Sequence, residues 1–127
     1  MKAILGALVF IALATVGAAQ GVPRVVLQTS DLSTPGREAI TAVVEFLPGM
    51  ATDRHTHPGE MVGYVLEGTF TTAQAGQPDR TFNAGQSFII PADSPHVHSN
   101  NGPTPARMFV TYIVEKGRPL YARVPEP

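Results

Sequence analysis

The sequence predicts an all-β protein with a single domain, built as a β-sandwich or a small β-barrel. About eight to ten short apolar runs follow one another with turn residues between them, and this regular spacing is typical of such folds. The chain has 127 residues with 12 glycines and 12 prolines, which favours short strands over long helices. No stretch after residue 19 shows a convincing helical period.

The individual strands follow from period-2 alternation and from runs of β-branched residues. They are expected at residues 24–28, 38–47, 52–57, 61–67, 69–73, 81–82, 86–90, 94–99 and 106–115. Residues 38–47 are apolar on both faces, as in a strand that is covered on both sides. Residues 116–127 are expected to form an extended tail. The core or a pocket wall should take the large side chains Phe46, Phe88, Met108, Phe109 and Tyr112.

The first 19 residues have the order of a secretory signal peptide. A basic start at Lys2 is followed by an apolar run over residues 3–16 and then by the small residues Gly17, Ala18 and Ala19. The run is shorter than the roughly 20 apolar residues that span a membrane comfortably. The alternative is an uncleaved anchor or a buried helix. Cleavage after the small residues would leave residues 20–127 as the single domain of a periplasmic or secreted protein, without stable membrane insertion.

The composition excludes several kinds of function. The net charge is −1 at pH 7, so no strong positive field exists for nucleic acid or for an anionic membrane surface. The chain has no cysteine, which excludes disulfides, thiolate metal ligands and cysteine nucleophiles. A metal would therefore be bound by histidine, carboxylate, methionine or water.

The four histidines of the chain form two pairs. His55 and His57 are one residue apart, as are His96 and His98, so period-2 alternation puts each pair on one face of its strand. Histidines gathered in this way point to a metal site. The alternative is that they are surface or core histidines with no metal.

Two motifs around these histidines resemble those of the cupin family. The first cupin motif runs G, five residues, H-x-H, three or four residues, E, six residues, G, and the matching residues are Gly49, His55, His57 and Gly68. The second runs G, five residues, P-x-G, two residues, H, three residues, N, and its matches are Gly85, Pro91, His96 and Asn100. Asp93 stands where the second motif has its second glycine, and aspartate tolerates turn geometry.

The resemblance covers residues 38–115 and implies a jelly-roll β-barrel like that of small single-domain bacterial cupins. It also implies that His55, His57 and His96 converge from different strands on one divalent transition metal, which would be Zn, Fe, Mn, Ni or Cu. Because such cupins often pair through sheet edges, we expect a homodimer.

The family's carboxylate ligand falls on Met61, one residue after Glu60, and this departure leaves three arrangements open. Met61 could ligate through its thioether and favour a softer ion such as copper, or it could form only an apolar wall. Glu60 could instead reach in through a register shift of one residue. We expect Met61 to line the site and Glu60 to face away. Without a carboxylate the site carries the full +2 charge of the ion, which favours an anionic ligand.

His98 matches no position of the two motifs. It is expected to make a hydrogen bond in the pocket rather than to bind the metal. Arg54 is expected to be solvated or paired with Asp53 or Glu60 rather than to clamp a substrate.

The function favoured by these residues is that of an exported metal-binding cupin, an oxidoreductase of the dioxygenase type acting on a small phenolic or enolic ligand. The metal would lower the pKa of the substrate oxygen, with Glu60 or His98 as the candidate proton acceptor. The alternative is a non-enzymatic module that senses or carries a small molecule or the metal. A metal-free isomerase or a structural cupin is a third reading.

Overall fold

The computed structural model describes residues 22–126, which form ten β-strands and no helix. The predicted signal peptide, residues 1–19, lies outside the described residues. Within residues 22–126 no helix is long and apolar enough to cross a membrane. The prediction of an all-β jelly roll is confirmed.

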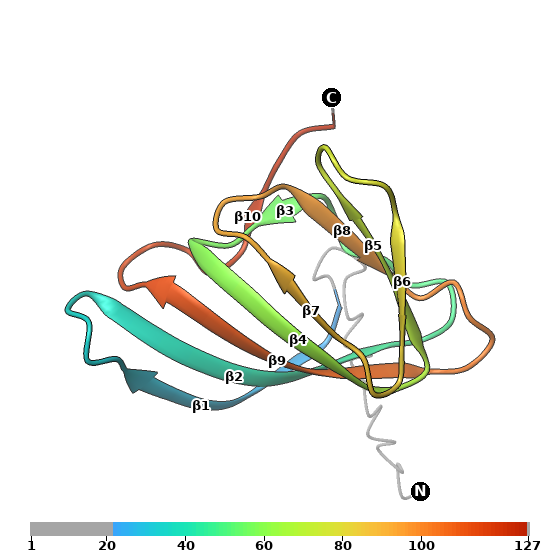
Figure 1. Cartoon of the computed structure of the whole chain (residues 1–127), viewed down its shortest axis with the longest axis horizontal. Helices are drawn as coiled ribbons and strands as arrows, with labels where there is room; N and C mark the ends of the chain where they lie inside the picture. Colours follow the sequence, from blue (N-terminus) through green and yellow to red (C-terminus); the bar gives the residue numbers. More distant parts are fainter. Residues whose placement is uncertain (1–21, 127) are drawn as a thin grey trace, which may run out of the picture.

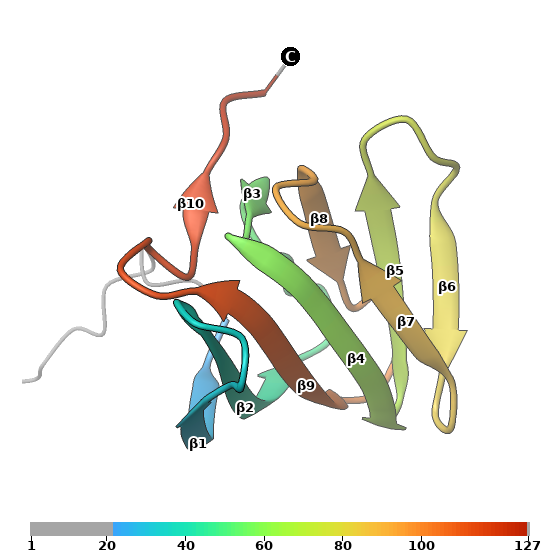
Figure 2. The ribbon, with the colours of Figure 1, turned by 60° about the vertical axis from the view of Figure 1, so that its left-hand side comes forward.

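The strands form two five-stranded sheets in which all neighbours are antiparallel (Figures 1 and 2). The first sheet has the order β1 (Arg24–Asp31), β2 (Arg37–Phe46), β9 (Ala106–Glu115), β4 (Gly59–Glu67) and β7 (Ser87–Ile90). The second has the order β10 (Ala122–Arg123), β3 (His55–Thr56), β8 (His96–Ser99), β5 (Thr69–Gln74) and β6 (Arg80–Asn83). Apart from the hairpins β1–β2 and β5–β6, consecutive strands therefore cross from one sheet to the other, as in a jelly roll.

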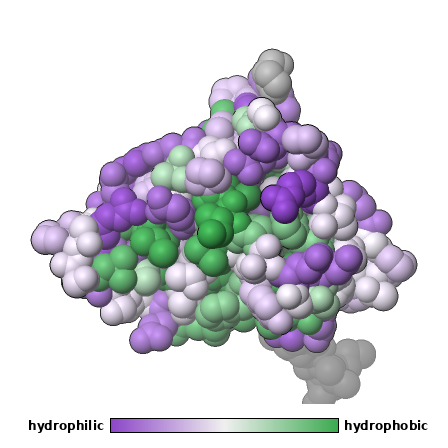
Figure 3. All heavy atoms as spheres, viewed as in Figure 1, coloured by the Kyte–Doolittle hydropathy of each residue, from purple (hydrophilic) through white to green (hydrophobic). Residues whose placement is uncertain are grey.

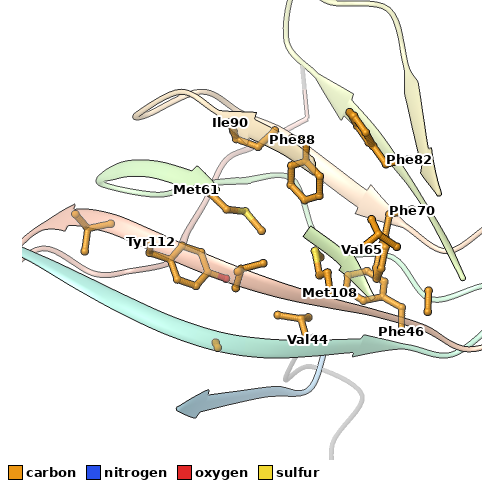
Figure 4. Close-up of a cluster of buried hydrophobic side chains, with 14 residues drawn as sticks. Val44, Phe46, Met61, Val65, Phe70, Phe82, Phe88, Ile90, Met108 and Tyr112 are labelled. Carbon is orange, nitrogen blue, oxygen red and sulfur yellow. The ribbon is translucent and has the colours of Figure 1, made fainter. Parts of the chain in front are cut away.

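The core lies between the two sheets and is built from alternate residues of each strand. On β9 the inward residues are Met108, Val110, Tyr112 and Val114, all at most 3% exposed, as the alternation predicts. Figure 4 shows Met61, Phe88, Met108 and Tyr112 pointing into this interior.

Two expectations about the core were wrong. Phe109 is 36% exposed, because it lies on the outward face of β9 opposite its buried neighbours. Only one face of β2 is buried: Glu45 on the other face is exposed and pairs with Arg107 across the sheet. Apolar side chains on both faces of a strand therefore did not mean that both faces are covered.

Gly63 of β4 leaves the space that the ring of Phe88 fills. A Cβ atom built on Gly63 would lie 2.2 Å from Cζ of Phe88, so only glycine allows this approach. The ring of Phe88 packs in turn against that of His98, with ring centroids 5.3 Å apart. The absence of a side chain on β4 thus supports the position of a histidine on β8.

The C-terminal segment, expected to be an extended tail, adds the two-residue strand β10 to the second sheet. Ala122 and Arg123 of β10 pair with Thr56 and His55 of β3. The main-chain N–H of Val124 also donates to the carbonyl of Arg54 at 2.8 Å. The tail is thereby placed against the first histidine pair (Figure 2).

The outward face of the first sheet carries exposed apolar side chains. Tyr64, Leu66 and Ile89 are 46%, 41% and 65% exposed. Figure 3 shows hydrophobic residues gathered over β4, β7 and β9 on this face. At the sheet edge, β1 adds the exposed residues Val25, Val26 and Leu27.

Candidate metal centre

Three histidines from two parts of the chain meet between the sheets. His55 on β3 stands directly opposite His96 on β8 in the strand register, with ring centroids 4.2 Å apart. His57 follows β3, and its ring lies 4.8 Å from that of His55 and 5.2 Å from that of His96. One nitrogen of each ring lies within 4.8 Å of the nitrogens of the other two. Such a cluster of three imidazoles suits a transition metal.

The hydrogen bonds of the three rings determine which nitrogen is free. Nδ1 of His55, His57 and His96 lies 2.7, 2.6 and 2.9 Å from the main-chain carbonyls of Asp53, Leu120 and Ser94. Because a carbonyl only accepts, each Nδ1 must carry the proton and donate it. Each Nε2 is then left with a lone pair. Hydrogen bonds of this kind orient the rings that bind metals in proteins.

Two of the three free nitrogens are buried without other partners. Nε2 of His57 and of His96 has no hydrogen-bond partner among the residues that the structure describes. All three side chains are at most 4% exposed. Leaving a buried acceptor without a partner costs about 1 to 3 kcal/mol. Two such nitrogens side by side therefore indicate that a binding partner is missing, and a metal ion would be a suitable partner for both.

Burial keeps the cluster neutral. Desolvation, together with the neighbouring charges of His96 and His57, lowers the pKa of His55 to about 3. Desolvation also lowers the pKa of His57 to about 4 and lowers that of His96. The rings therefore remain unprotonated at neutral pH, which is the state that binds a metal.

These shifts predict how the stability of chelator-treated protein depends on pH. In the unfolded chain each histidine takes up a proton near pH 6.5, whereas folded His55 and His57 resist protonation until about pH 3 and 4. Below pH 6.5 the unfolded state thus binds more protons, and the free energy of unfolding should fall as the pH is lowered towards 4. The slope is up to about 1.4 kcal/mol per pH unit for each histidine.

Urea denaturation between pH 7.5 and pH 4 measures this slope. Replacing His57 with asparagine should make it shallower. A free energy of unfolding that stays constant across this range would contradict the buried, neutral cluster.

Met61 and Tyr112 approach the histidines from the facing sheet. Met61 is the residue opposite Tyr112 in the register of β4 and β9, and both side chains point inward (Figure 4). The ring of Tyr112 lies 4.8 Å from that of His57. Met61 is 2% exposed and lines the same cavity as His55 and His57. The position of the family's carboxylate thus carries a thioether in the wall of the site.

His98 lies beside the cluster but outside the group of three. Its ring centroid is 4.9 Å from that of His96 and 6.4 Å from that of His55. Its Nδ1 shares a hydrogen bond of 2.9 Å with the hydroxyl of Thr72, and its Nε2 is buried without a partner among the described residues. Burial lowers the pKa of His98 well below 6.5. It is a neutral side chain in the cavity wall with one unused nitrogen.

The structure does not bring Glu60 to the histidines. Its side chain lies on the outward face of β4, is 45% exposed, and accepts a hydrogen bond of 3.1 Å from Nη2 of Arg37. Arg54, too, stays away from the cavity and donates to the carbonyl of Pro125 at 2.8 Å.

Two motif residues outside the cluster keep the loops in place. Asn100 is fully buried, donates to the carbonyls of Phe46 and Thr104, and accepts from the N–H of Gly102. Asp93 has a φ of 54°, which aspartate tolerates, and its N–H donates to the carbonyl of His57 at 2.9 Å. The second motif therefore supports the first through its backbone.

The C-terminal segment contributes side chains and carbonyls that sequence reasoning missed. The ring of Tyr121 stacks on that of His55 at 4.3 Å and 17°, and the carbonyl of Leu120 holds His57. No motif signalled either residue, because both belong to a stretch with three prolines and no alternating pattern.

A cavity of about 750 Å³ opens in front of the histidines. One wall carries His55, His57 and His98, and the facing wall carries Met61 and Tyr112. The other residues of the lining are Val22, Pro23, Arg24, Val44, Phe46, Thr52, Asp53, Met108, Tyr121 and Arg123. Its volume lies in the range of sites for small organic molecules.

A jelly roll of two antiparallel sheets, with three buried imidazoles in front of a cavity, defines a β-barrel with a histidine metal site. Residues 42–112 match the Cupin domain family. The chain belongs to the cupin family, as the two motifs predict.

Individual relatives are similar over only part of their length. Oxalate oxidase 2 of Hordeum vulgare is 32% identical over 77 residues, which cover 54% of this chain and 34% of that protein. The chain thus spans about a third of the length of this curated relative.

Solved structures show the same fold. A Klebsiella pneumoniae protein with a double-stranded β-helix domain has a TM-score of 0.67 at 20% identity, covering 87% of this chain and 90% of that one. A recombinant oxalate oxidase in complex with glycolate has a TM-score of 0.65 at 25% identity, covering 83% and 56%.

Proposed function

We propose that the protein is an exported cupin in which His55, His57 and His96 hold one divalent transition metal, and that it is an oxidoreductase of the dioxygenase type acting on a small organic ligand. One observation carries the metal centre: each ring donates its Nδ1 proton to a main-chain carbonyl, which leaves an Nε2 lone pair on each. The bound ion would polarise a ligand oxygen as a Lewis acid. The similarity to oxalate oxidase supports an oxidoreductase with a small ligand.

The residues around the cluster have separate roles in this proposal. Tyr112 and Met61 form a largely apolar wall that keeps water from the ligand. His98 is the candidate proton acceptor: its Nε2 has no partner among the described residues and carries a lone pair when Nδ1 donates to the hydroxyl of Thr72. Glu60 has no part in it, because its carboxylate faces outward and is paired with Arg37.

A non-enzymatic binding module is the second candidate, and one observation favours it. Among residues 22–126 the only carboxylate in the cavity wall is that of Asp53, which is paired with Arg123 at 3.2 Å. The cavity thus offers no free carboxylate as a general base, and a sensor or carrier needs none.

Metal analysis of protein purified from its native compartment tests both candidates. We expect about one equivalent of a single transition metal per chain, and less than about a tenth of an equivalent would rule out the metal centre. Oxygen uptake with catechols, flavonols, β-diketones and small organic acids then separates the candidates. Turnover supports the oxidoreductase, and no turnover by fully metallated protein supports the binding module.

Export and dimerisation remain predictions. Export rests on residues 1–19 of the sequence. A homodimer would be supported by the exposed apolar residues of β1, Val25, Val26 and Leu27, because an apolar sheet edge is normally covered.

A further inference from the structure

The charges around the cavity are unbalanced. Two arginines line it, Arg24 and Arg123, together with one carboxylate, that of Asp53. Arg123 and Asp53 pair with each other at 3.2 Å. Arg24 takes part in none of the ion pairs formed by residues 22–126. A metal held by three neutral histidines would add further positive charge without a carboxylate ligand, because that position carries Met61.

Arg24 lines the same cavity as His55 and His57. Its Cζ lies 5.6 Å from the ring centroid of Tyr112, and that ring lies 4.8 Å from the ring of His57. Since 5.6 Å and 4.8 Å add to 10.4 Å, the guanidinium lies no further than this from the His57 ring, and both groups contact the ring of Tyr112.

The charge of Arg24 also reaches the rings that surround the cavity. After burial, which is the main cause, it contributes to the lowered pKa values of His55 and His57. Burial raises the pKa of Tyr112, and the charge of Arg24 partly offsets this increase. Arg24 is itself exposed, but its guanidinium lies against the ring of Tyr112, which is 3% exposed.

We propose that Arg24 is a carboxylate-binding residue, and that the cavity takes a small organic acid whose carboxylate pairs with Arg24 while a second oxygen group at the other end binds at the three histidines. This inference rests on the proposed metal centre. A guanidinium matches a carboxylate with two parallel hydrogen bonds, and no carboxylate of residues 22–126 occupies it. The apolar residues between the two ends, Val44, Met61 and Met108, would pack against a short carbon skeleton.

The ligand class is therefore that of hydroxy, oxo or dicarboxylic acids with a few carbons. A neutral phenol or diketone could bind the metal through its oxygen but would leave Arg24 without a carboxylate partner. Arg24 would thus be the residue that selects acids over neutral ligands of the same size.

Binding to Co²⁺-loaded full-length protein tests the inference, because the visible spectrum of the ion reports both its retention and the arrival of a ligand. The probes are glycolate, malonate and succinate, with malonamide as the uncharged counterpart of malonate. We expect at least one acid to bind, and malonamide to bind at least about tenfold more weakly than malonate. Arg24→Gln should weaken the acid by about tenfold or more and leave the Co²⁺ content and malonamide binding unchanged.

Two further variants serve as controls. Arg80→Gln removes an equal charge from a residue that packs on Phe82 outside this cavity, and it should bind acids as the unaltered protein does. Arg24→Lys should recover part of the affinity, since it keeps the charge without the planar fork.

Equal affinity of the acids for Arg24→Gln and unaltered protein, both holding Co²⁺, would overturn the inference, as would Co²⁺-loaded protein that binds no acid. If the protein does not retain Co²⁺, the proposed metal centre is wrong. Simultaneous binding of an acid to Arg24 and the metal is then ruled out as well.

Discussion

Protein with asparagine in place of His96 is expected to lose its transition metal. The ring of His96 lies 4.2 Å from that of His55 and 5.2 Å from that of His57, so this substitution removes one of the three nitrogens that would hold the ion. Removing even a hydrogen-bond partner behind a metal ligand lowers affinity by about 10- to 100-fold, and removing the ligand should cost more. Metal content after dialysis, with a competition titration for affinity, gives the measurement.

His98→Gln is the matched control for this variant. His98 lies two residues further on the same buried face of β8, yet it stands outside the group of three. This variant should keep about one metal per chain. Equal metal content in the two variants would contradict the assignment of ligands, provided that circular dichroism shows both to be folded.

Replacing Met61 with glutamate is expected to make the stability of the fold depend on the metal. Met61 is 2% exposed, and an unpaired carboxylate at this depth costs several kcal/mol. In a domain of this size such a cost lowers the melting temperature of the metal-free protein by about 10 °C or more. With Mn²⁺ or Fe²⁺ bound, the new carboxylate becomes a ligand and most of the loss is recovered, because harder ions favour oxygen. Thermal unfolding with and without each ion measures both effects.

Met61→Gln provides the comparison, since it has the same length without the charge. It should be destabilised to a smaller extent and show no additional recovery with Mn²⁺. If Met61→Glu gains no more from Mn²⁺ than Met61→Gln does, residue 61 does not face the ion.

Much of the fold could be predicted because period-2 alternation is a direct physical signal. The expected strand over residues 106–115 is β9 at the same bounds, and its alternate residues Met108, Val110, Tyr112 and Val114 form one buried face. The alternation is less informative where both faces are apolar. Phe109 and the outward side of β2 are examples, because the number of apolar residues in this small domain exceeds what one core can bury.

The metal cluster could be predicted from spacing, whereas the rest of the site could not. The two motifs place His55, His57 and His96 together because paired strands bring one nitrogen of each ring within 4.8 Å of the other two. Arg24, Leu120 and Tyr121 come from the ends of the domain, and their contacts depend on how β1 and β10 close the two sheets. Local sequence patterns do not predict such contacts between residues far apart in the chain.

The carbonyl of Leu120 has a consequence for the order of events during synthesis. A ribosome makes the three histidines well before it reaches residue 120, yet the hydrogen bond that fixes the tautomer of His57 needs that later residue. A nascent chain therefore carries all its ligands while one imidazole is still free to rotate and to protonate on either nitrogen. Loading with the correct ion would await the segment that carries Leu120, so the compartment in which folding ends, rather than the one in which translation begins, would decide which metal is acquired.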